Sequence, residues 1–372
     1  MPSFKPTELW EAAPHTLAKI EIVRQYLVRW FQILGLEHPS PRLMYIDGFA
    51  GPGAYTNTSD SSPLAALRAA AQVLKSTPAL GSKEFGFLFT EKEQWCAEHL
   101  RAVIQKEALP KQIQWEVRQE SFEDGVGGIL KENRSNGEQL APTFAFIDPF
   151  GATGLPFAVI QEILSHRSCE VLLNLDSDGI ARLFKASDVV KNEAHLDSLF
   201  GDGSWRSALQ PDAGIRELSP QILTLYKRRL LSIPRVQYVF AFAMHNANGK
   251  LSYHLVFASQ HPLGLEKMKE AMESVDKSGL YSFSDATAGQ SELPFDFKQP
   301  DAFARRMQAT LGGMPRPYND FHDYALNETP FRNPKVMLEL LKREGAVDVA
   351  WKGVPAKRGF PADKIETILL RQ

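Results

Sequence analysis

The chain has 372 residues, 44% of them hydrophobic, which is enough for a sizeable core in one large domain with an insertion or in about two to three domains. Its formal net charge of −2 excludes a global electrostatic attraction to nucleic acid or membranes, so any basic site has to be local. Only two cysteines occur, Cys96 and Cys169, without a CxxC or HExxH motif, and no run of about eighteen apolar residues is present. We therefore expect a cytoplasmic protein with two reduced core cysteines, no structural metal and no membrane span.

The first half of the chain alternates helical and extended patterns. Residues 15–36 carry apolar side chains at helical spacing and predict an amphipathic helix. Five apolar runs then predict buried strands with helices between them: RLMYID, EFGFLFTEKE, IQWEVRQESFED, TFAFIDPFG and CEVLLNLDSDG. The first of these helices begins near Ser62 and Pro63, which fit its cap and its first turn. Such alternation predicts a parallel sheet covered by helices on both faces.

The alternation stops after the fifth predicted strand. Residues 178–233 have a polar, helical pattern with a basic run near the end, and we interpret them as an insertion. The runs VQYVFAFAMHN and LSYHLVFAS follow, and the Asn248–Gly249 pair between them is a strong hairpin signal. A parallel sheet that ends in an antiparallel hairpin is unusual for a dinucleotide dehydrogenase. It is usual for Rossmann-like methyltransferases that use S-adenosylmethionine (SAM), so we predict an α/β domain of that kind over residues 1–277.

The remainder of the chain predicts two further parts. Residues 278–328 are rich in Pro, Asp and Gln and predict an irregular linker or arm. Residues 329–372 show a helix (NPKVMLELLKREG), a strand (VDVAW), a basic loop and a closing strand (ETILL), which predicts a winged-helix-like domain. This segment holds nine Lys or Arg and five Asp or Glu, so it is basic while the rest of the chain is acidic. A basic module on an acidic body indicates nucleic-acid contact, although the same charges also suit a small domain docked on a partner protein.

The turn after the first predicted strand indicates a ligand. It reads Asp47-Gly-Phe49-Ala-Gly51-Pro-Gly53, and glycine allows a backbone to approach a ligand closely and to adopt φ > 0. A nicotinamide fingerprint needs a third glycine, where this chain has Thr56. The pattern D-x-F-x-G-x-G fits the first methyltransferase motif instead. There the carboxylate of Asp47 would face the amino group of SAM, and Gly51 and Gly53 would admit its methionine and ribose; a tight turn without a ligand is the alternative.

Further cofactor contacts are expected at the ends of the next two strands. Glu91 ends the second strand and can accept both ribose hydroxyls with one carboxylate, although TEKE also resembles a helix-capping sequence. Ser121 and Phe122 follow the third strand, where such folds contact the adenine. Helix capping by Ser121 explains these residues equally well.

The fourth predicted strand ends in Asp148-Pro149-Phe150-Gly151. Amino-methyltransferases carry an acid or amide here, then two prolines and an aromatic residue. The polar side chain and a carbonyl accept hydrogen bonds from the target amine, and the ring stacks on the base. This chain has one proline, and its aromatic residue comes one position earlier. Because ligands bind at the carboxyl ends of such strands, we expect Asp148 and Phe150 to be catalytic. A turn in which Phe150 packs into the core is the alternative.

Several of these segments resemble the three-Cys-motif partner protein family (TcmP). The similarity lies in HTLAKIEIVRQYL, YIDGFAGPG, SSPL, FAFIDPFG and MHNANGKLSYHLVFASQHPLGLEKMKEAM, and it extends to Thr329–Pro330 and to the loop at Arg358–Gly359–Phe360. The resemblance implies a Rossmann-type methyltransferase architecture and a radical-SAM-like partner protein that carries the three cysteines. It also supports His15 and Lys19 as site candidates, and we expect Lys19 among the cofactor-binding residues. Plain surface positions on the first helix are the alternative for both residues, and the resemblance leaves the substrate open.

Together these patterns favour a SAM-dependent methyltransferase that acts on nucleic acid or on a nucleotide-like amine. Methyl transfer from a sulfonium needs mainly alignment, so few acid–base residues are expected, and the sequence reveals no His/Asp or Cys/His constellation. The residues expected to hold the substrate are the basic ones of the insertion and of the terminal loop: Lys227, Arg228, Arg229, Lys357 and Arg358. One alternative is a non-catalytic protein that binds nucleic acid or a partner on a Rossmann-like scaffold. The other is a SAM- or nucleotide-binding subunit that serves the three-Cys protein.

Overall fold

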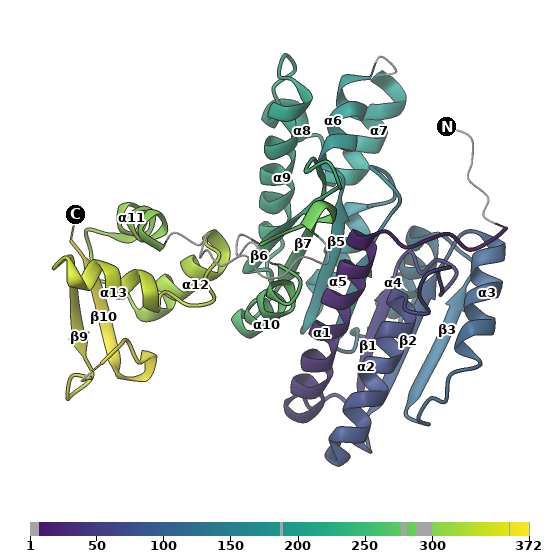
Figure 1. Ribbon diagram of the computed structural model, residues 1–372, viewed down its shortest axis with the longest axis horizontal. Coiled ribbons are helices and arrows are strands. Elements are labelled where there is room, and N and C mark those ends of the chain that lie inside the picture. Colours follow the sequence, from purple (N-terminus) through teal and green to yellow (C-terminus); the bar gives the residue numbers. More distant parts are fainter. Residues whose placement is uncertain (1–6, 187–188, 277–280, 288–299, 357, 372) are drawn as a thin grey trace. The chain divides into compact units, whose positions relative to one another are not determined.

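The computed structural model describes residues 7–186, 189–276, 281–287, 300–356 and 358–371 (Figure 1). The chain divides into a larger unit, formed by residues 1–275 and 282–290, and a smaller unit, formed by residues 276–281 and 291–372. Within the described ranges, the larger unit contains an eight-stranded sheet and the smaller unit contains a two-stranded sheet.

The strands of the larger unit are β1 (Arg42–Asp47), β2 (Glu84–Thr90), β3 (Ile113–Arg118), β4 (Thr143–Ile147), β5 (Cys169–Leu175), β6 (Tyr238–His245), β7 (Leu251–Ser259) and β8 (Ser282–Ser284). They lie in the order β3-β2-β1-β4-β5-β7-β6-β8. β1 to β5 are parallel, β7 runs antiparallel to β5 and β6, and β8 pairs in parallel with β6. This is the Rossmann-like arrangement of SAM-dependent methyltransferases, and it confirms the predicted parallel sheet with its antiparallel hairpin.

The helices of the larger unit are α1 (Pro14–Glu37), α2 (Ser62–Ser76), α3 (Gln94–Ile104), α4 (Phe122–Asn136), α5 (Phe157–Ser165), α6 (Ser177–Lys185), α7 (Val189–Phe200), α8 (Trp205–Ala208), α9 (Ile215–Leu231) and α10 (Pro262–Glu273), with 3-10 turns η1 (Pro78–Leu80) and η2 (Asp285–Thr287). α1 packs against α2 and α10, and α4 packs against α5 on the other face of the sheet (Figure 1). α6 to α9 occupy the segment predicted as a helical insertion. The cap of α2 is Ser61 and not the predicted Ser62, because the Ser61 hydroxyl accepts the hydrogen bond from the N–H of Leu64.

The central strands are buried on both faces because their side chains alternate between two apolar layers. On β4, the ring centroid of Phe144 lies 5.0 Å from that of Tyr26 on α1. The next residue, Ala145, points to the opposite layer, where it belongs to the same cluster as Ile46 and Ile160. This two-sided burial explains why the strands appear in the sequence as continuous apolar runs.

The smaller unit contains α11 (Pro300–Leu311), α12 (Tyr318–Glu328), α13 (Lys335–Arg343), the 3-10 turn η3 (Ala362–Lys364) and an antiparallel pair, β9 (Val347–Trp351) and β10 (Ile365–Leu370). The predicted irregular arm is wrong for α11 and α12. Both helices bury apolar side chains in one cluster with α13 and β10, for example Phe321 beside Leu341 and Ile368 in that cluster. Between α11 and α12, Arg316 forms an isolated bridge with Ile368.

Part of that expected arm, residues 288–299, lies outside the described residues. In the part of the chain that the structure describes, no helix is both long enough and apolar enough to cross a membrane.

Candidate functional site

A cavity of about 670 Å³ opens beyond the carboxyl ends of β1, β2 and β3. Its wall contains predicted site residues from four different segments: Phe49, Gly51, Glu91, Ser121, Phe122 and Phe150. Ligands of open α/β sheets bind at this edge where the strand order reverses, which here is between β1 and β4. The volume lies in the range of small-molecule and cofactor sites. The fold therefore brings most of the predicted cofactor residues to one cavity.

The two glycines of the turn after β1 have different roles. Both have positive φ, 63° at Gly51 and 80° at Gly53, a conformation that side-chain-bearing residues rarely adopt. A Cβ atom at Gly51 would meet nothing within 4 Å, and Gly51 lines the cavity. A Cβ atom at Gly53 would lie 2.6 Å from Cδ1 of Leu100 on α3. Gly53 thus packs closely against α3 and does not line the cavity, and its predicted cofactor contact stays a prediction.

Glu91 lies in the cavity wall with 9% of its surface exposed. Its Oε2 accepts a hydrogen bond from the N–H of Gly51 at 2.9 Å, and its Oε1 accepts one from the N–H of Glu93 at 2.8 Å. Burial raises the pKa of Glu91, and the backbone donors oppose this rise. The carboxylate therefore ties the glycine turn to Glu93, the residue before α3. The capping alternative is not borne out, because α3 has no side-chain cap. Each oxygen keeps a lone pair for a further donor.

Asp47 is fully buried beneath the turn and does not line the cavity. Its Oδ1 accepts a hydrogen bond from the N–H of Phe49, and its Oδ2 accepts one from the hydroxyl of Tyr45, both at 3.2 Å. Burial raises the pKa of Asp47 to about 7, although hydrogen bonds from Ser62 and Phe49 lower it. Asp47 thus supports the turn from below, and its predicted contact with the amino group of the cofactor stays a prediction.

The start of α4 provides another part of the wall. The Ser121 hydroxyl accepts a hydrogen bond from the N–H of Asp124 at 3.1 Å, so the capping explanation holds for this residue. Phe122 is 2% exposed, and its ring centroid lies 6.0 Å from that of Phe49. This aromatic pair gives the cavity an apolar surface suited to a planar heterocycle.

Asp148, directly after β4, is the centre of a second and more polar part of the site. Its Oδ2 accepts a hydrogen bond from Nζ of Lys19 at 2.5 Å, and its Oδ1 accepts one from Nδ2 of Asn174 at 2.8 Å. Lys19 lies on α1, is buried, and places its Nζ 5.0 Å from the ring centroid of Tyr253. Lys19 therefore belongs with Asp148 and does not line the cavity beyond β1, β2 and β3.

Phe150 is 78% exposed, although it lies only two positions after Asp148. The alternative in which its ring packs into the core is therefore wrong. The ring stands at the wall of the cavity, on a surface that a flat substrate can reach.

A His–Asp pair lies beside this polar cluster. Nδ1 of His15 and Oδ2 of Asp285 are 2.8 Å apart, although the residues are 270 positions apart in sequence. The His15 ring packs edge-on against Tyr253 at a centroid distance of 5.9 Å. The expectation of no His/Asp constellation is wrong, because Asp285 follows β8, a three-residue strand that has no clear sequence pattern.

Three buried polar atoms of the cluster have no hydrogen-bond partner among the described residues: Oδ1 of Asn174, the hydroxyl of Tyr253 and Oδ1 of Asp285. Burial, together with the charges of Asp148 and Asp285, raises the pKa of Tyr253. Buried polar groups are nearly always paired, so these atoms mark a place for a polar ligand or for water. Sequence reasoning missed all three residues. Only Asn174, a polar residue near the end of an apolar strand, carries a visible signal.

The basic run of the insertion lies away from Asp148. α9 leads into β6, whose first residue pairs with Ser259. Ser259 lies at the edge of the sheet opposite to the edge that carries Asp148. The last turns of α9, with Lys227, Arg228 and Arg229, therefore lie toward that edge. Arg229 is 2.9 Å from Asp202 in an ion pair and donates to the carbonyl of Phe200. Arg229 thus joins α9 to the segment around Phe200 and Asp202, and its predicted substrate contact stays a prediction.

The other predicted basic residues belong to the smaller unit. Arg358 is exposed there, and Lys357 lies outside the described residues. Across the described ranges no group of three His, Cys, Asp or Glu side chains is placed to hold a metal ion. Cys96 and Cys169 are free, and burial raises the pKa of each thiol to about 12, so neither is a ready nucleophile.

No family model and no curated protein matches the chain. Matching solved structures include an O-methyltransferase from Bacillus cereus in complex with SAH, at 14% identity over 63% of this chain and 79% of that chain, with a TM-score of 0.34. Trm1 from Pyrococcus horikoshii with S-adenosyl-L-methionine matches at 11% identity over 94% of this chain and 90% of that chain, with a TM-score of 0.35. Protein LPL1258 from Legionella pneumophila matches at 12% identity over 68% and 91%, with a TM-score of 0.37. Similarity at this level concerns the fold alone and does not identify site residues or a substrate.

The buried carboxyl of Asp47 predicts a pH dependence of stability. Its pKa is about 7 in the folded chain and near its ordinary 3.8 when unfolded. The folded state therefore binds the extra proton, and this contribution to the free energy of unfolding is lost as pH rises from about 4 to about 7. Asp47→Asn removes this titration. Urea unfolding should show the wild type losing stability relative to Asp47→Asn across that window, by at most about 1.4 kcal/mol per pH unit.

The exposed Asp212→Asn is the matched control for that measurement, and its difference from wild type should not change with pH. A wild-type to Asp47→Asn difference that is constant from pH 4 to 7 would contradict a raised pKa at Asp47.

Proposed function

We propose that the protein is a SAM-dependent methyltransferase that acts on nucleic acid or on a nucleotide-like amine. The observation that carries this proposal is the cavity beyond β1 to β3, which joins an open glycine at Gly51, the carboxylate of Glu91 and the aromatic surface of Phe122. The exposed ring of Phe150 stands at the same cavity. The resemblance to the TcmP family agrees with this proposal for the fold and adds nothing about the substrate.

The residues of the cavity fit such a cofactor. The free lone pairs of Glu91 suit the two ribose hydroxyls, and the Phe49–Phe122 pair suits the adenine. Gly51 leaves room for the chain that links the ribose to the methionine part. The chemistry that the bound group supplies is an electrophilic methyl group on a sulfonium.

The polar cluster supplies what an acceptor amine requires. Asp148 is a fixed acceptor that can receive an N–H bond and direct the amine lone pair. Methyl transfer to this amine would form an N–CH₃ bond at the expense of the S–CH₃ bond, and the methylated amine would then have to lose a proton. His15, whose Nδ1 is engaged by Asp285, offers its other ring nitrogen as a proton acceptor.

The smaller unit is proposed as the nucleic-acid-binding part. Its elements follow the order helix, bridge, helix, helix, strand, strand. The isolated bridge of Arg316 to Ile368 lies where a winged helix has its short third strand, which supports this proposal. The loop between β9 and β10, which carries the exposed Arg358, corresponds to the wing. The excess of basic residues from 329 to 372 suits a phosphate backbone.

A second candidate function is a non-catalytic subunit that binds SAM or a nucleotide and serves a three-Cys partner protein. One observation favours it: Lys19 and Asn174 already engage both oxygens of Asp148. An acceptor amine therefore has to share Asp148 with Lys19 or displace it. Measured turnover with SAM separates the two candidates.

The cofactor assignment predicts that SAM binding depends on the open cavity. Thr153 is exposed in the cavity wall, so Thr153→Trp should obstruct the space without disturbing the core. We expect calorimetry to show at least about a tenfold loss of SAM affinity for Thr153→Trp, or roughly 1.4 kcal/mol. Thr153→Ala should bind like the wild type. A wild type that binds NAD but not SAM would overturn the assignment.

The acceptor assignment predicts that Asp148 and Phe150 affect different steps. Asp148→Ala should leave SAM affinity within a few-fold and lower methyl transfer by about 10²–10³, by analogy with the loss of one positioned hydrogen-bonding group. Phe150→Leu should weaken binding of a base substrate by roughly 1–3 kcal/mol, with the melting temperature unchanged because the ring is exposed. Labelled SAM and total cellular nucleic acid provide the assay. Transfer at the wild-type rate by Asp148→Ala would show that the acceptor site lies elsewhere.

The nucleic-acid assignment predicts a change in salt dependence. Arg358→Glu should lower the slope of log affinity against log salt by about one for each lost phosphate contact. The exposed Lys131→Glu on α4 changes the net charge equally and is the matched control, which should keep the wild-type slope. An unchanged slope for Arg358→Glu would favour a smaller unit that docks on a partner protein.

A further inference from the structure

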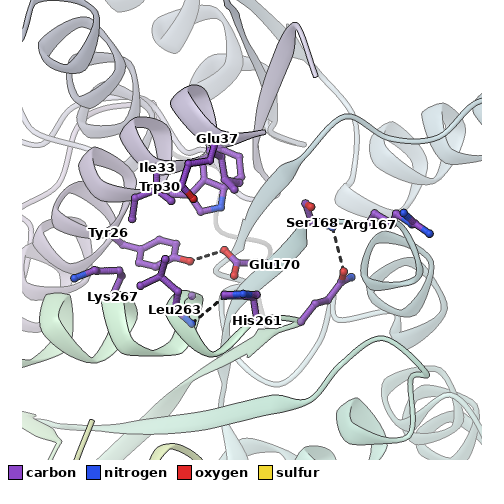
Figure 2. A pocket seen from close by; sticks show the side chains of 13 residues that line it. Tyr26, Trp30, Ile33, Glu37, Arg167, Ser168, Glu170, His261, Leu263 and Lys267 are labelled. Carbon is purple, nitrogen blue, oxygen red and sulfur yellow. Dashed lines mark hydrogen bonds between the residues drawn. The ribbon is translucent and has the colours of Figure 1, made fainter. Parts of the chain in front are cut away.

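A second cavity, of about 350 Å³, lies between α1 and α10 at the edge of the sheet opposite the candidate functional site (Figure 2). Glu170, the second residue of β5, lines it, and Ser259 ends β7 beside it. Tyr26, Trp30 and Ile33 reach it from α1, and Leu263 reaches it from α10. None of the residues that line this cavity lines the cavity beyond β1 to β3, which is the one proposed for SAM and is called the cofactor cavity below.

Glu170 is a buried carboxyl whose hydrogen-bond neighbours are donors. Its Oε1 accepts a hydrogen bond from the Ser259 hydroxyl at 2.6 Å, and its Oε2 accepts one from the hydroxyl of Tyr26. The indole N–H of Trp30 forms no hydrogen bond with standard distance and angle. It nevertheless lies near Glu170 and lowers the pKa of that carboxyl group. The overall pKa of Glu170 is raised, because burial outweighs these donors. The hydrogen-bond donors therefore stabilise the carboxylate form only in part, and no positive charge is paired with it.

The basic groups at the cavity do not neutralise Glu170. Among the described residues no Lys, Arg or His forms an ion pair with it. Lys267 is paired with Glu270 at 2.9 Å, and Nδ1 of His261 accepts a hydrogen bond from the N–H of Leu263. Arg167 lines the cavity without contacting the carboxylate. A buried carboxylate without a positive partner is costly, so the cavity favours a ligand that brings one.

We propose that this cavity binds a small organic cation, with an ammonium head at Glu170 and an apolar body between α1 and α10. The ammonium head gains the carboxylate of Glu170 as its countercharge. The rings of Tyr26 and Trp30 add aromatic faces that attract cations. Ile33, Leu34 and Leu263 provide the apolar wall for the body. The proposal is independent of the methyltransferase function and goes beyond it.

The test compares two probes of equal size, phenethylammonium and phenethyl alcohol, by titration calorimetry on the full chain. The wild type should bind the ammonium at least about tenfold more tightly than the alcohol, since charge-assisted hydrogen bonds are the stronger ones. Glu170→Gln keeps the side-chain shape and removes the charge, so it should bring the two affinities to within about twofold. Glu37→Gln changes an exposed carboxylate in the same wall and should keep the wild-type preference.

A second variant keeps the proposal testable if Glu170→Gln does not fold. Leu263→Trp should fill the cavity and lower the affinity of both probes at least about tenfold, while Leu231→Trp at an exposed position should not. Thr153→Trp, which obstructs the cofactor cavity, should leave probe binding unchanged. Equal binding of the two probes, no binding of either, a preference that survives Glu170→Gln, or a loss in Thr153→Trp would each overturn the proposal.

Discussion

The docking of α1 across the sheet is the constraint on which the polar cluster around Asp148 and the cavity at Glu170 depend. Most of this interface is apolar, and apolar contacts alone tolerate sliding of a helix. Two polar contacts remove that freedom: Lys19 with Asp148 at one edge of the sheet, and Tyr26 with Glu170 near the other. Because a shift of α1 by one turn would break both and leave buried polar groups unpaired, these contacts specify one position of the helix.

The two parts of the candidate site depend on the docking of α1 to different degrees. The cofactor cavity is built from turns that follow β1 to β4 and does not need α1 for its wall. The polar cluster needs α1, because His15 and Lys19 both come from it. If an acceptor binds at Asp148 as proposed, it has to share this carboxylate with Lys19 or displace it. The proposed substrate step would in this way depend on a helix that precedes the sheet in the chain.

Asp47 and Glu170 are similar buried carboxyl groups, but burial of the first affects stability, and burial of the second affects the proposed binding of a cation. Both have raised pKa values because of burial, and both accept hydrogen bonds from a tyrosine hydroxyl. Asp47 lies beneath a turn with no access to a cavity, so its uncompensated charge affects stability. Glu170 lines a cavity, so the same unfavourable charge becomes a source of binding free energy for a cation.

Local patterns in the amino acids were enough to predict the strands, the hairpin and the edge of the sheet at which the candidate site lies. Each buried strand is one apolar run, and the carboxyl ends of parallel strands share one edge, so Glu91 and Asp148 could be expected near a common site. Other features depended on how distant segments pack. They are the close approach of Gly53 to Leu100, the exposure of Phe150 and the pairing of Asp285 with His15. The helices at 300–328 were missed because their apolar residues are few and make sense only against α13 and β10. The neighbours of a residue along the chain were enough to predict the buried strands, because each strand is one apolar run. The partners of Asp148 and His15 could not be predicted in this way, because they come from distant segments that meet only when α1 and β8 dock.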